Sequence, residues 1–256
     1  MKTFLLCVGA QKAGTTWLYE YLAQNSHVNF GRLKEYHIWD AIYLNECSNF
    51  AAEKDDYLRY SLQRLSGAYE KYFSSLITGG ISLTGDITPS YSGLPVEAFK
   101  LLRKKLESEG FDVKVVFLMR DPFERCWSAV RMGLRTKVLE GTEMDLLRSL
   151  YKSAGYIFRT NYVYTIKNLE LVFEDKQIYY GIYEEIFELD ALKSISDFVG
   201  VHYDPDFVKK YFNISPKSNT PELELKREIV NFYSNVYQFC FERFPQTKML
   251  WNSLNE

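Results

Sequence analysis

The sequence has few cysteines, no long apolar run and almost no net charge, and each absence excludes a class of protein. Cys7, Cys47, Cys126 and Cys240 are scattered without paired spacing, which argues against a disulfide framework or zinc site and favours free thiols in a reducing compartment. No segment reaches 18 apolar residues, and the first apolar run is too short for a signal peptide, so we expect no membrane span and a cytoplasmic location. A net charge of −2 argues against a nucleic-acid surface, so any anion site must be a local cluster.

The chain instead has the composition and periodicity of an α/β protein. Its 256 residues, 46% of them hydrophobic, suffice for one domain, residues 1–256, with a large core. Apolar runs predict strands, and apolar residues three or four apart predict helices. The expected strands are 3–9, 28–30, 81–85, 113–119 and 177–182, and the expected helices are 14–25, 55–77, 95–108, 143–152, 158–172 and a long one from 220. This alternation predicts a mostly parallel central sheet flanked by helices, with ligands at the carboxyl ends of the strands.

The first motif, residues 9–17 (GAQKAGTTW), lies between the first strand and the first helix. The free N–H groups and the dipole at a helix start attract anions, Lys12 adds a full charge, and Thr15 adds a hydroxyl donor. A nucleoside-triphosphate P-loop requires Gly, four residues and then Gly-Lys-Ser/Thr. Here Lys12 precedes Gly14 by two positions, and Thr15 stands where that lysine would be. The motif therefore predicts a phosphate loop of a different kind; the alternative is a plain strand-to-helix turn.

The second motif begins where the strand 113–119 ends. Arg120 follows the strand, Asp121 and Pro122 open a helix as N-cap and first helical residue, and Ser128 lies eight residues after Arg120. Arginine grips phosphate with two parallel hydrogen bonds, and a serine hydroxyl can donate to the same group. The alternatives are an ion pair of Arg120 that closes the helix start, and a packing role for Ser128.

Together these motifs resemble the two phosphate sites of sulfotransferases that use PAPS (3′-phosphoadenosine 5′-phosphosulfate). The resemblance implies a P-loop-like three-layer sandwich, a sulfuryl donor PAPS that leaves as the product PAP, and no metal, because the lysine and the helix dipole would replace it. It places the 5′-phosphosulfate on the first loop and the 3′-phosphate on the second. The implied PAPS-binding residues are Lys12, Ala13, Gly14, Thr15, Thr16, Trp17, Arg120 and Ser128, together with Lys217.

Residues 34–39 (KEYHIW) resemble the Lys-Glu-x-His-aromatic stretch of carbohydrate sulfotransferases, in which the glutamate is the proposed base. A neutral alcohol is a poor nucleophile, and a well-placed base contributes roughly 10²–10⁴-fold. Glu35 is therefore the expected base, and Lys12 is expected to stabilise the leaving phosphate. His37, whose ordinary pKa of about 6.5 suits the role, is the rival. Alternatively, Glu35 is a solvated loop charge, and His37 packs or orients Glu35.

Two further segments complete the resemblance. Residues 86–91 (DITPSY) resemble a family segment that borders the sulfuryl group and the acceptor, or they form a simple proline turn. Ile87 stands where heparan-type enzymes have a second lysine, so that subgroup is not matched. Lys217, in the segment 216–221, is either a cofactor contact or part of a solvated loop. Tyr162 and Tyr183 are expected to be structural.

The sequence therefore predicts a sulfotransferase that moves a sulfuryl group to a hydroxyl or amine by in-line displacement. The expected partner is a small-molecule or saccharide acceptor; the sequence specifies neither its identity nor the oligomeric state. The rivals are a P-loop kinase or NTPase, and a non-catalytic module that binds PAP.

Overall fold

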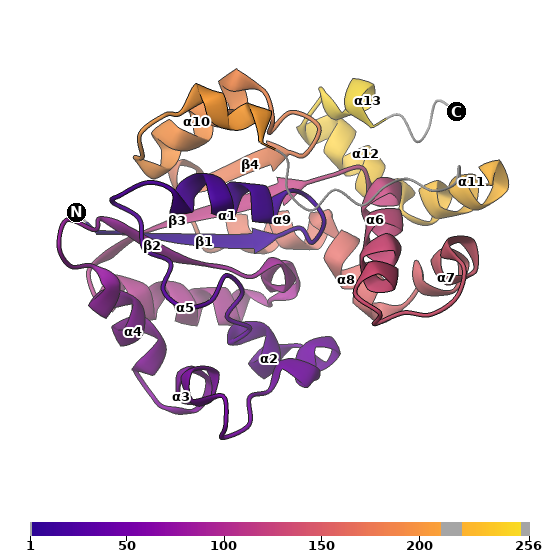
Figure 1. Ribbon diagram of the computed structural model, residues 1–256. Coiled ribbons are helices and arrows are strands. Elements are labelled where there is room, and N and C mark those ends of the chain that lie inside the picture. Colours follow the sequence, from indigo (N-terminus) through magenta and orange to yellow (C-terminus); the bar gives the residue numbers. More distant parts are fainter. Residues whose placement is uncertain (1, 211–221, 252–256) are drawn as a thin grey trace.

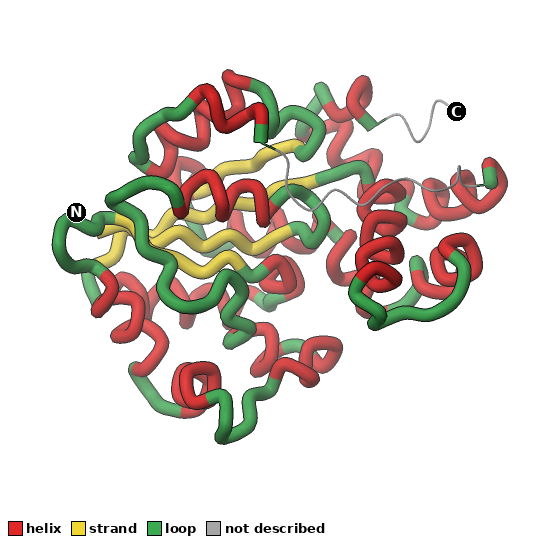
Figure 2. Tube along the Cα trace, viewed as in Figure 1, coloured by secondary structure: helices red, strands yellow, loops and turns green. Residues whose placement is uncertain are grey.

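Four parallel strands form the centre of the fold. A computed structural model describes residues 2–210 and 222–251, and within them the sheet has the order β2-β1-β3-β4 (Figures 1 and 2). The strands are β1 Lys2–Gly9, β2 Leu83–Ile87, β3 Phe111–Met119 and β4 Ile178–Ile182. Residues 4–8 of β1 and 115–117 of β3 are completely buried. Such continuous apolar runs are typical of parallel strands that are covered on both faces.

Helices cover both faces of this sheet and make it the middle of three layers, as predicted. In Figure 1, α1 crosses the front of the sheet and α9 lies behind it. On one face, a small cavity is lined by Leu18 of α1, Ile195 of α10 and Leu118 of β3. On the other face, the ring of Phe73 in α4 packs edge-on against Phe4 of β1 at 5.0 Å. The helices are α1 Thr15–Ala23, α2 Trp39–Tyr43, α3 Tyr57–Arg64, α4 Ala68–Leu76, α5 Val96–Ser108, α6 Pro122–Arg135, α7 Glu143–Leu150, α8 Ala154–Thr160, α9 Tyr162–Glu170, α10 Leu189–Val199, α11 Leu223–Phe232, α12 Ser234–Arg243 and α13 Thr247–Leu250.

Three long helices expected from periodicity are each divided in the structure. The segment 55–77 breaks at Gly67, whose φ of 81° is left-handed, so that α3 and α4 form a pair instead of one rod. Residues 158–172 divide at Asn161, whose side chain caps α9 by accepting from Tyr164 N. The C-terminal segment divides into α11 and α12 at Tyr233; its predicted start at residue 220 lies outside the described residues.

Two expected strands also differ from the structure. Residues 28–30 make only a single parallel bridge, between Val28 and Leu83, and the strand expected at 81–85 runs instead over Leu83–Ile87. Asp86 therefore lies inside β2. In the described part of the chain, no helix combines the length and the apolar character needed to cross a membrane.

The sheet brings separate parts of the sequence together at one edge. Because all four strands are parallel, their carboxyl ends lie at the same edge of the sheet. The last residues of the strands are Gly9, Ile87, Met119 and Ile182. The loops that follow these residues carry the motifs predicted from the sequence. A site at this edge would combine segments more than 100 residues apart.

Candidate active site

A cavity of about 350 Å³ opens at the carboxyl edge of the sheet. It brings together the first loop, Arg120, Ser128 and the Glu35–His37 pair. Its walls are formed by Gln11, Lys12, Gly14, Thr15, Thr16, Trp17, Glu35, His37, Phe50, Pro89, Ser90, Arg120, Ser128, Met132, Arg159, Tyr183 and Phe187.

The loop between β1 and α1 ends in a glycine that no other residue could replace without strain. Gly14, the N-cap of α1, has a φ of 92°, and a Cβ added there would collide with Cδ1 of Ile186. Leu18 N donates to Gly14 O, whereas the N–H groups of Thr15, Thr16 and Trp17 have no carbonyl acceptor within the helix. The loop therefore presents free donors and the positive end of a helix dipole to the cavity.

Lys12 lies in a crowded group of cations. Burial, together with the charges of Arg135, Arg120 and Arg131, lowers its pKa to about 8. An anion in the cavity would relieve both effects and hold Lys12 in its charged form. Lys12 also has a φ of 71°. Among the described non-glycine residues only Lys12, His37 and Lys137 have positive φ, and the first two line the cavity, as strained residues at functional sites often do.

Arg120 reaches the cavity from the end of β3. Its guanidinium donates to Lys12 O at 3.3 Å and to Glu124 Oε2 at 3.1 Å, and it lies over the ring of Tyr183 at 4.2 Å. Its Nε is buried without a hydrogen-bond partner in the described structure. Arg120 thus forms an ion pair at the start of α6, the alternative role for this residue, and it also lines the cavity.

Of the other residues predicted to bind PAPS, some line the cavity and some do not. Ser128 lies on α6, is only 6% exposed and lines the cavity. Trp17 lines the cavity while its Nε1 donates to Lys210 O at 3.1 Å. Ala13 does not line the cavity, because its methyl group is buried and its N–H donates to Ala10 O at 3.2 Å. Lys217 lies outside the described residues.

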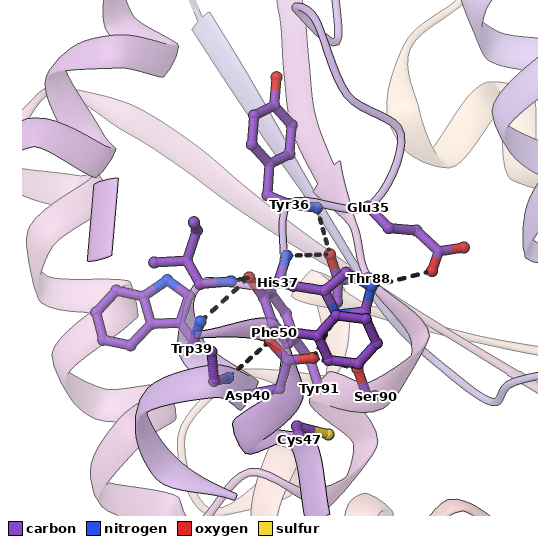
Figure 3. A network of polar contacts seen from close by, with 12 residues as sticks. Glu35, Tyr36, His37, Trp39, Asp40, Cys47, Phe50, Thr88, Ser90 and Tyr91 are labelled. Atoms are coloured by element: carbon purple, nitrogen blue, oxygen red, sulfur yellow. Dashed lines mark hydrogen bonds and ion pairs between the residues drawn. The ribbon is translucent and has the colours of Figure 1, made fainter. Parts of the chain in front are cut away.

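Glu35, His37 and Asp40 form a chain of charged groups, of which Glu35 and His37 line the cavity and Asp40 is buried (Figure 3). His37 Nδ1 lies 2.6 Å from Asp40 Oδ2, and Nε2 lies 3.4 Å from Glu35 Oε2. Lys34 Nζ holds the other oxygen of Glu35 at 2.6 Å. The ring of Phe50 stacks on His37 with centroids 3.6 Å apart. The imidazole is therefore fixed on both nitrogens and on one face.

These pairings set the protonation states of the two rival bases. Burial alone would lower the pKa of His37, but the hydrogen bonds to Asp40 and Glu35 outweigh it and raise this pKa to about 9. Burial alone would raise the pKa of Glu35, but His37 and Lys34 outweigh it and lower this pKa to about 2. At neutral pH the pair is an imidazolium and a carboxylate, and only the carboxylate has a lone pair free to accept a proton.

A buried aspartate holds the backbone beneath this network. Asp86 is completely buried, which raises its pKa to about 6, and it accepts from Thr88 Oγ1 at 2.6 Å and from Tyr91 Oη at 2.8 Å. Thr88 Oγ1 in turn accepts from Tyr36 N at 3.0 Å, and Tyr91 Oη accepts from Ile38 N at 3.1 Å. The segment 86–91 therefore positions the backbone on either side of His37, and only Pro89 and Ser90 of it reach the cavity.

Sequence reasoning missed several residues of this site. Asp40 could have been found, because it is a carboxylate only three residues after His37 in the sequence. Its Oδ2 also accepts from Ser90 Oγ. Phe50 and Arg159 carried no sequence signal, since tertiary packing alone brings them to the cavity.

The geometry defines an α/β protein in which the loop before α1, Arg120 and the carboxylate of Glu35 line one cavity. A family model for the sulfotransferase domain matches residues 2–230, and the chain belongs to this family. It is therefore an enzyme that transfers a sulfuryl group.

Solved structures show the same fold. A sulfotransferase from Alicyclobacillus acidocaldarius superimposes with a TM-score of 0.63 at 20% identity, over 92% of each chain. A sulfotransferase domain from the curacin biosynthetic pathway gives a TM-score of 0.50 at 14% identity, over 91% of this chain and 98% of that one. No curated protein matches the sequence.

Proposed function

We propose that this enzyme moves a sulfuryl group from PAPS to a hydroxyl or amine of a small-molecule or saccharide acceptor, with residues 1–256 acting as one catalytic domain and Glu35 as general base. PAPS, when bound, supplies the sulfuryl group and leaves as PAP. The observation that carries the proposal is a single cavity lined by the first loop, by Arg120 with Ser128, and by Glu35. We call the part formed by Lys12, Thr15, Thr16, Arg120 and Ser128 the donor end, and the part formed by Glu35, His37, Phe50, Ser90 and Arg159 the acceptor end.

The donor end suits a ligand with two separate phosphate groups. The free N–H groups at the start of α1 and the cation of Lys12 would hold the 5′-phosphosulfate. The guanidinium of Arg120 and the hydroxyl of Ser128, two residues that line the cavity, would hold the 3′-phosphate. Lys12 would also stabilise the negative charge that develops on the leaving phosphate, as preorganised cations do in related transfers.

The acceptor end supports Glu35 rather than His37 as the base. With a pKa of about 9, His37 is protonated at neutral pH and cannot accept a proton. Glu35 is ionised, and although it is a weak base, the acceptor hydroxyl becomes a strong acid as its new bond to sulfur forms. The proton would pass to a Glu35 oxygen while the bond between sulfur and the phosphate oxygen breaks. His37 would orient Glu35 through the ion pair at 3.4 Å.

Calorimetric titration with PAP and with adenosine 5′-monophosphate, which lacks the 3′-phosphate, tests the donor end. We expect PAP to bind about 10- to 100-fold more tightly, and Arg120→Gln to remove most of that difference. The exposed Arg64→Gln is the matched control and should keep the difference. Equal affinity of the wild type for both nucleotides would contradict the assignment.

Turnover with radiolabelled PAPS separates the remaining alternatives. Transfer of label to an acceptor without added magnesium supports the proposal. Magnesium-dependent ATP turnover would favour a kinase or NTPase. Tight PAP binding without product from any acceptor would favour a non-catalytic module.

A further inference from the structure

Arg159 is a cation of the acceptor end that the proposed reaction does not use. It lies on α8, which packs against the turn 89–93 that carries Ser90, since a Cβ on Gly93 would press on the ring of Phe158 at 2.6 Å. Its Nη2 lies 3.8 Å from Cys47 Sγ. In Figure 3, Cys47 lies beyond Asp40, on the side away from Glu35. Arg159 therefore lines the cavity on the Asp40 side of His37.

The guanidinium of Arg159 has more donors than acceptors. It carries five N–H donors. Nη1 donates to Gly155 O at 2.8 Å, and the other recorded acceptor, Cys47 Sγ, is a weak one. Nε is buried and has no partner, and no carboxylate of the described ranges 2–210 and 222–251 forms an ion pair with Arg159. The remaining contact is with the ring of Phe158 at 4.2 Å.

The surroundings leave this positive charge uncompensated. Burial lowers the pKa of Arg159, and the nearby Arg125 lowers it further, whereas Cys47 and Asp40 act in the opposite direction. Asp40 is already bound to His37 and Ser90. Arg125 is completely buried, and among the described residues it too has no carboxylate partner. A partly buried cation without a counter-ion is costly, and an anion placed beside it is stabilised strongly.

We propose that the acceptor carries an oxyanion, which Arg159 binds while the acceptor hydroxyl or amine faces Glu35. The inference rests on the sulfuryl transfer proposed above and names the substrate class: a hydroxy or amino acid, or an acidic sugar. Phe50 and Met132, which also line the cavity, provide apolar surface for the body of the acceptor. Arginine suits planar carboxylate and tetrahedral phosphate or sulfate groups, so the shared chemistry is that of an oxyanion.

Matched probes that differ only in charge test this inference. 4-(Hydroxymethyl)benzoate is compared with 4-(hydroxymethyl)benzamide, and methyl glucuronoside with its amide, for kcat/KM with PAPS and for affinity to the PAP-saturated enzyme. For at least one pair we expect the acid to be preferred about 10- to 100-fold, the range expected for hydrogen bonds to a charged group. 4-(Hydroxymethyl)phenyl phosphate distinguishes a phosphate preference from a carboxylate preference.

Variants at position 159 assign the preference to this side chain. Arg159→Gln should abolish the preference for the acid and leave the affinity for PAP unchanged; Arg159→Lys should keep part of the preference. Arg148→Gln, an exposed arginine on the neighbouring α7, is the control and should keep all of it. Circular dichroism establishes that each variant is folded, and if the Gln variant is not, the wild-type ratio and the Lys variant decide.

The outcomes separate this inference from the proposed function. Two results would overturn the inference: equal kcat/KM and affinity for acids and amides in the wild type, or a preference for the acid that survives in Arg159→Gln. The proposed function would still stand if PAP binding were normal. If no probe is turned over, the affinity ratio for the PAP-saturated enzyme decides. If the wild type bound PAP no more tightly than adenosine 5′-monophosphate, both the inference and the proposed function would be overturned.

Discussion

The donor end and the acceptor end of the cavity are built by different means. The donor end consists mainly of backbone N–H groups and cations that immediately follow two neighbouring strands, β1 and β3. The acceptor end consists of side chains from four segments, held by long-range contacts such as the hydrogen bond from Gln63 to His37 O at 2.7 Å. Charge also differs: the donor end gathers cations, whereas the acceptor end alternates cations and carboxylates.

This difference indicates which end of the cavity should determine nucleotide affinity and which should determine the reaction rate. A backbone loop fixes phosphate positions with little dependence on neighbouring side chains. A base, by contrast, depends on partners that fix its charge and direction. Changes at the acceptor end should therefore alter rates and pH profiles while nucleotide affinity stays normal. Changes at the donor end should alter both.

Glu35→Gln should have the largest effect on rate with the smallest effect on binding. The amide cannot accept the acceptor proton, so we expect kcat to fall by about 10²–10⁴-fold. PAP affinity, measured by calorimetry, should stay within about threefold, because Glu35 belongs to the acceptor end. The exposed Glu97→Gln is the control. Unchanged turnover in Glu35→Gln, with a loss in His37→Gln, would reverse the roles.

Lys12→Ala should affect both turnover and donor binding. Removing the cation that faces the leaving phosphate should lower kcat by about 10²–10³-fold, as for other preorganised electrostatic groups. PAP affinity should fall as well, in contrast to Glu35→Gln. Lys104→Ala, an exposed lysine of α5, should change neither quantity. If only affinity fell while kcat was kept, Lys12 would bind the donor without stabilising the leaving group.

The same contrast explains what could be predicted from the sequence. The residues of the donor end could be predicted because a strand, a loop and a helix start follow one another along the chain. The positions of Gly14 and Arg120 at the ends of strands are therefore evident from the neighbouring sequence. The three-layer parallel fold was readable from strands such as residues 113–119. The sites themselves remain predictions until a ligand is bound.

The acceptor end was less readable because it depends on tertiary packing. Arg159 reaches the cavity only when α8 packs against the turn after β2, and nothing within residues 154–160 indicates this. The helix expected at 55–77 also looked continuous, since Tyr69 and Tyr72 keep the periodicity across Gly67. The chain leaves α3 at the extended Leu65 and enters α4 at the left-handed Gly67, and this turn does not disturb the apolar pattern on either side.

Asp40→Asn should weaken the acceptor end through His37. Without the carboxylate of Asp40, the pKa of His37 falls below about 9, because burial lowers it and Glu35 alone is left to raise it. A neutral His37 with its proton on Nδ1 would turn the lone pair of Nε2 toward Glu35 and repel it. We expect kcat at pH 8 to fall by about 10- to 100-fold through misplacement of the base.

The pH profile separates this positioning role from a merely structural one. In the wild type the decline in kcat at high pH should lie near pH 9, and in Asp40→Asn it should lie at lower pH, with PAP affinity unchanged. A uniform loss at every pH would indicate that Asp40 only stabilises the fold.

The free energy of unfolding should also depend on the charges of Glu35, His37 and Asp40, with a smaller effect. The folded-state pKa of His37, about 9, exceeds the unfolded value of about 6.5, so the stabilisation is fully present below pH 6.5 and is lost as the pH rises through 9. We expect this loss to be about 2–3 kcal/mol between these limits, measured by urea unfolding. Lys12, whose pKa is lowered, titrates in the opposite sense, so the wild type is compared with His37→Gln, which shares that contribution. If the two proteins lost stability in parallel between pH 6.5 and 9, His37 would not be the protonated partner of Glu35 and Asp40, and the charge assignment of the acceptor end would be wrong.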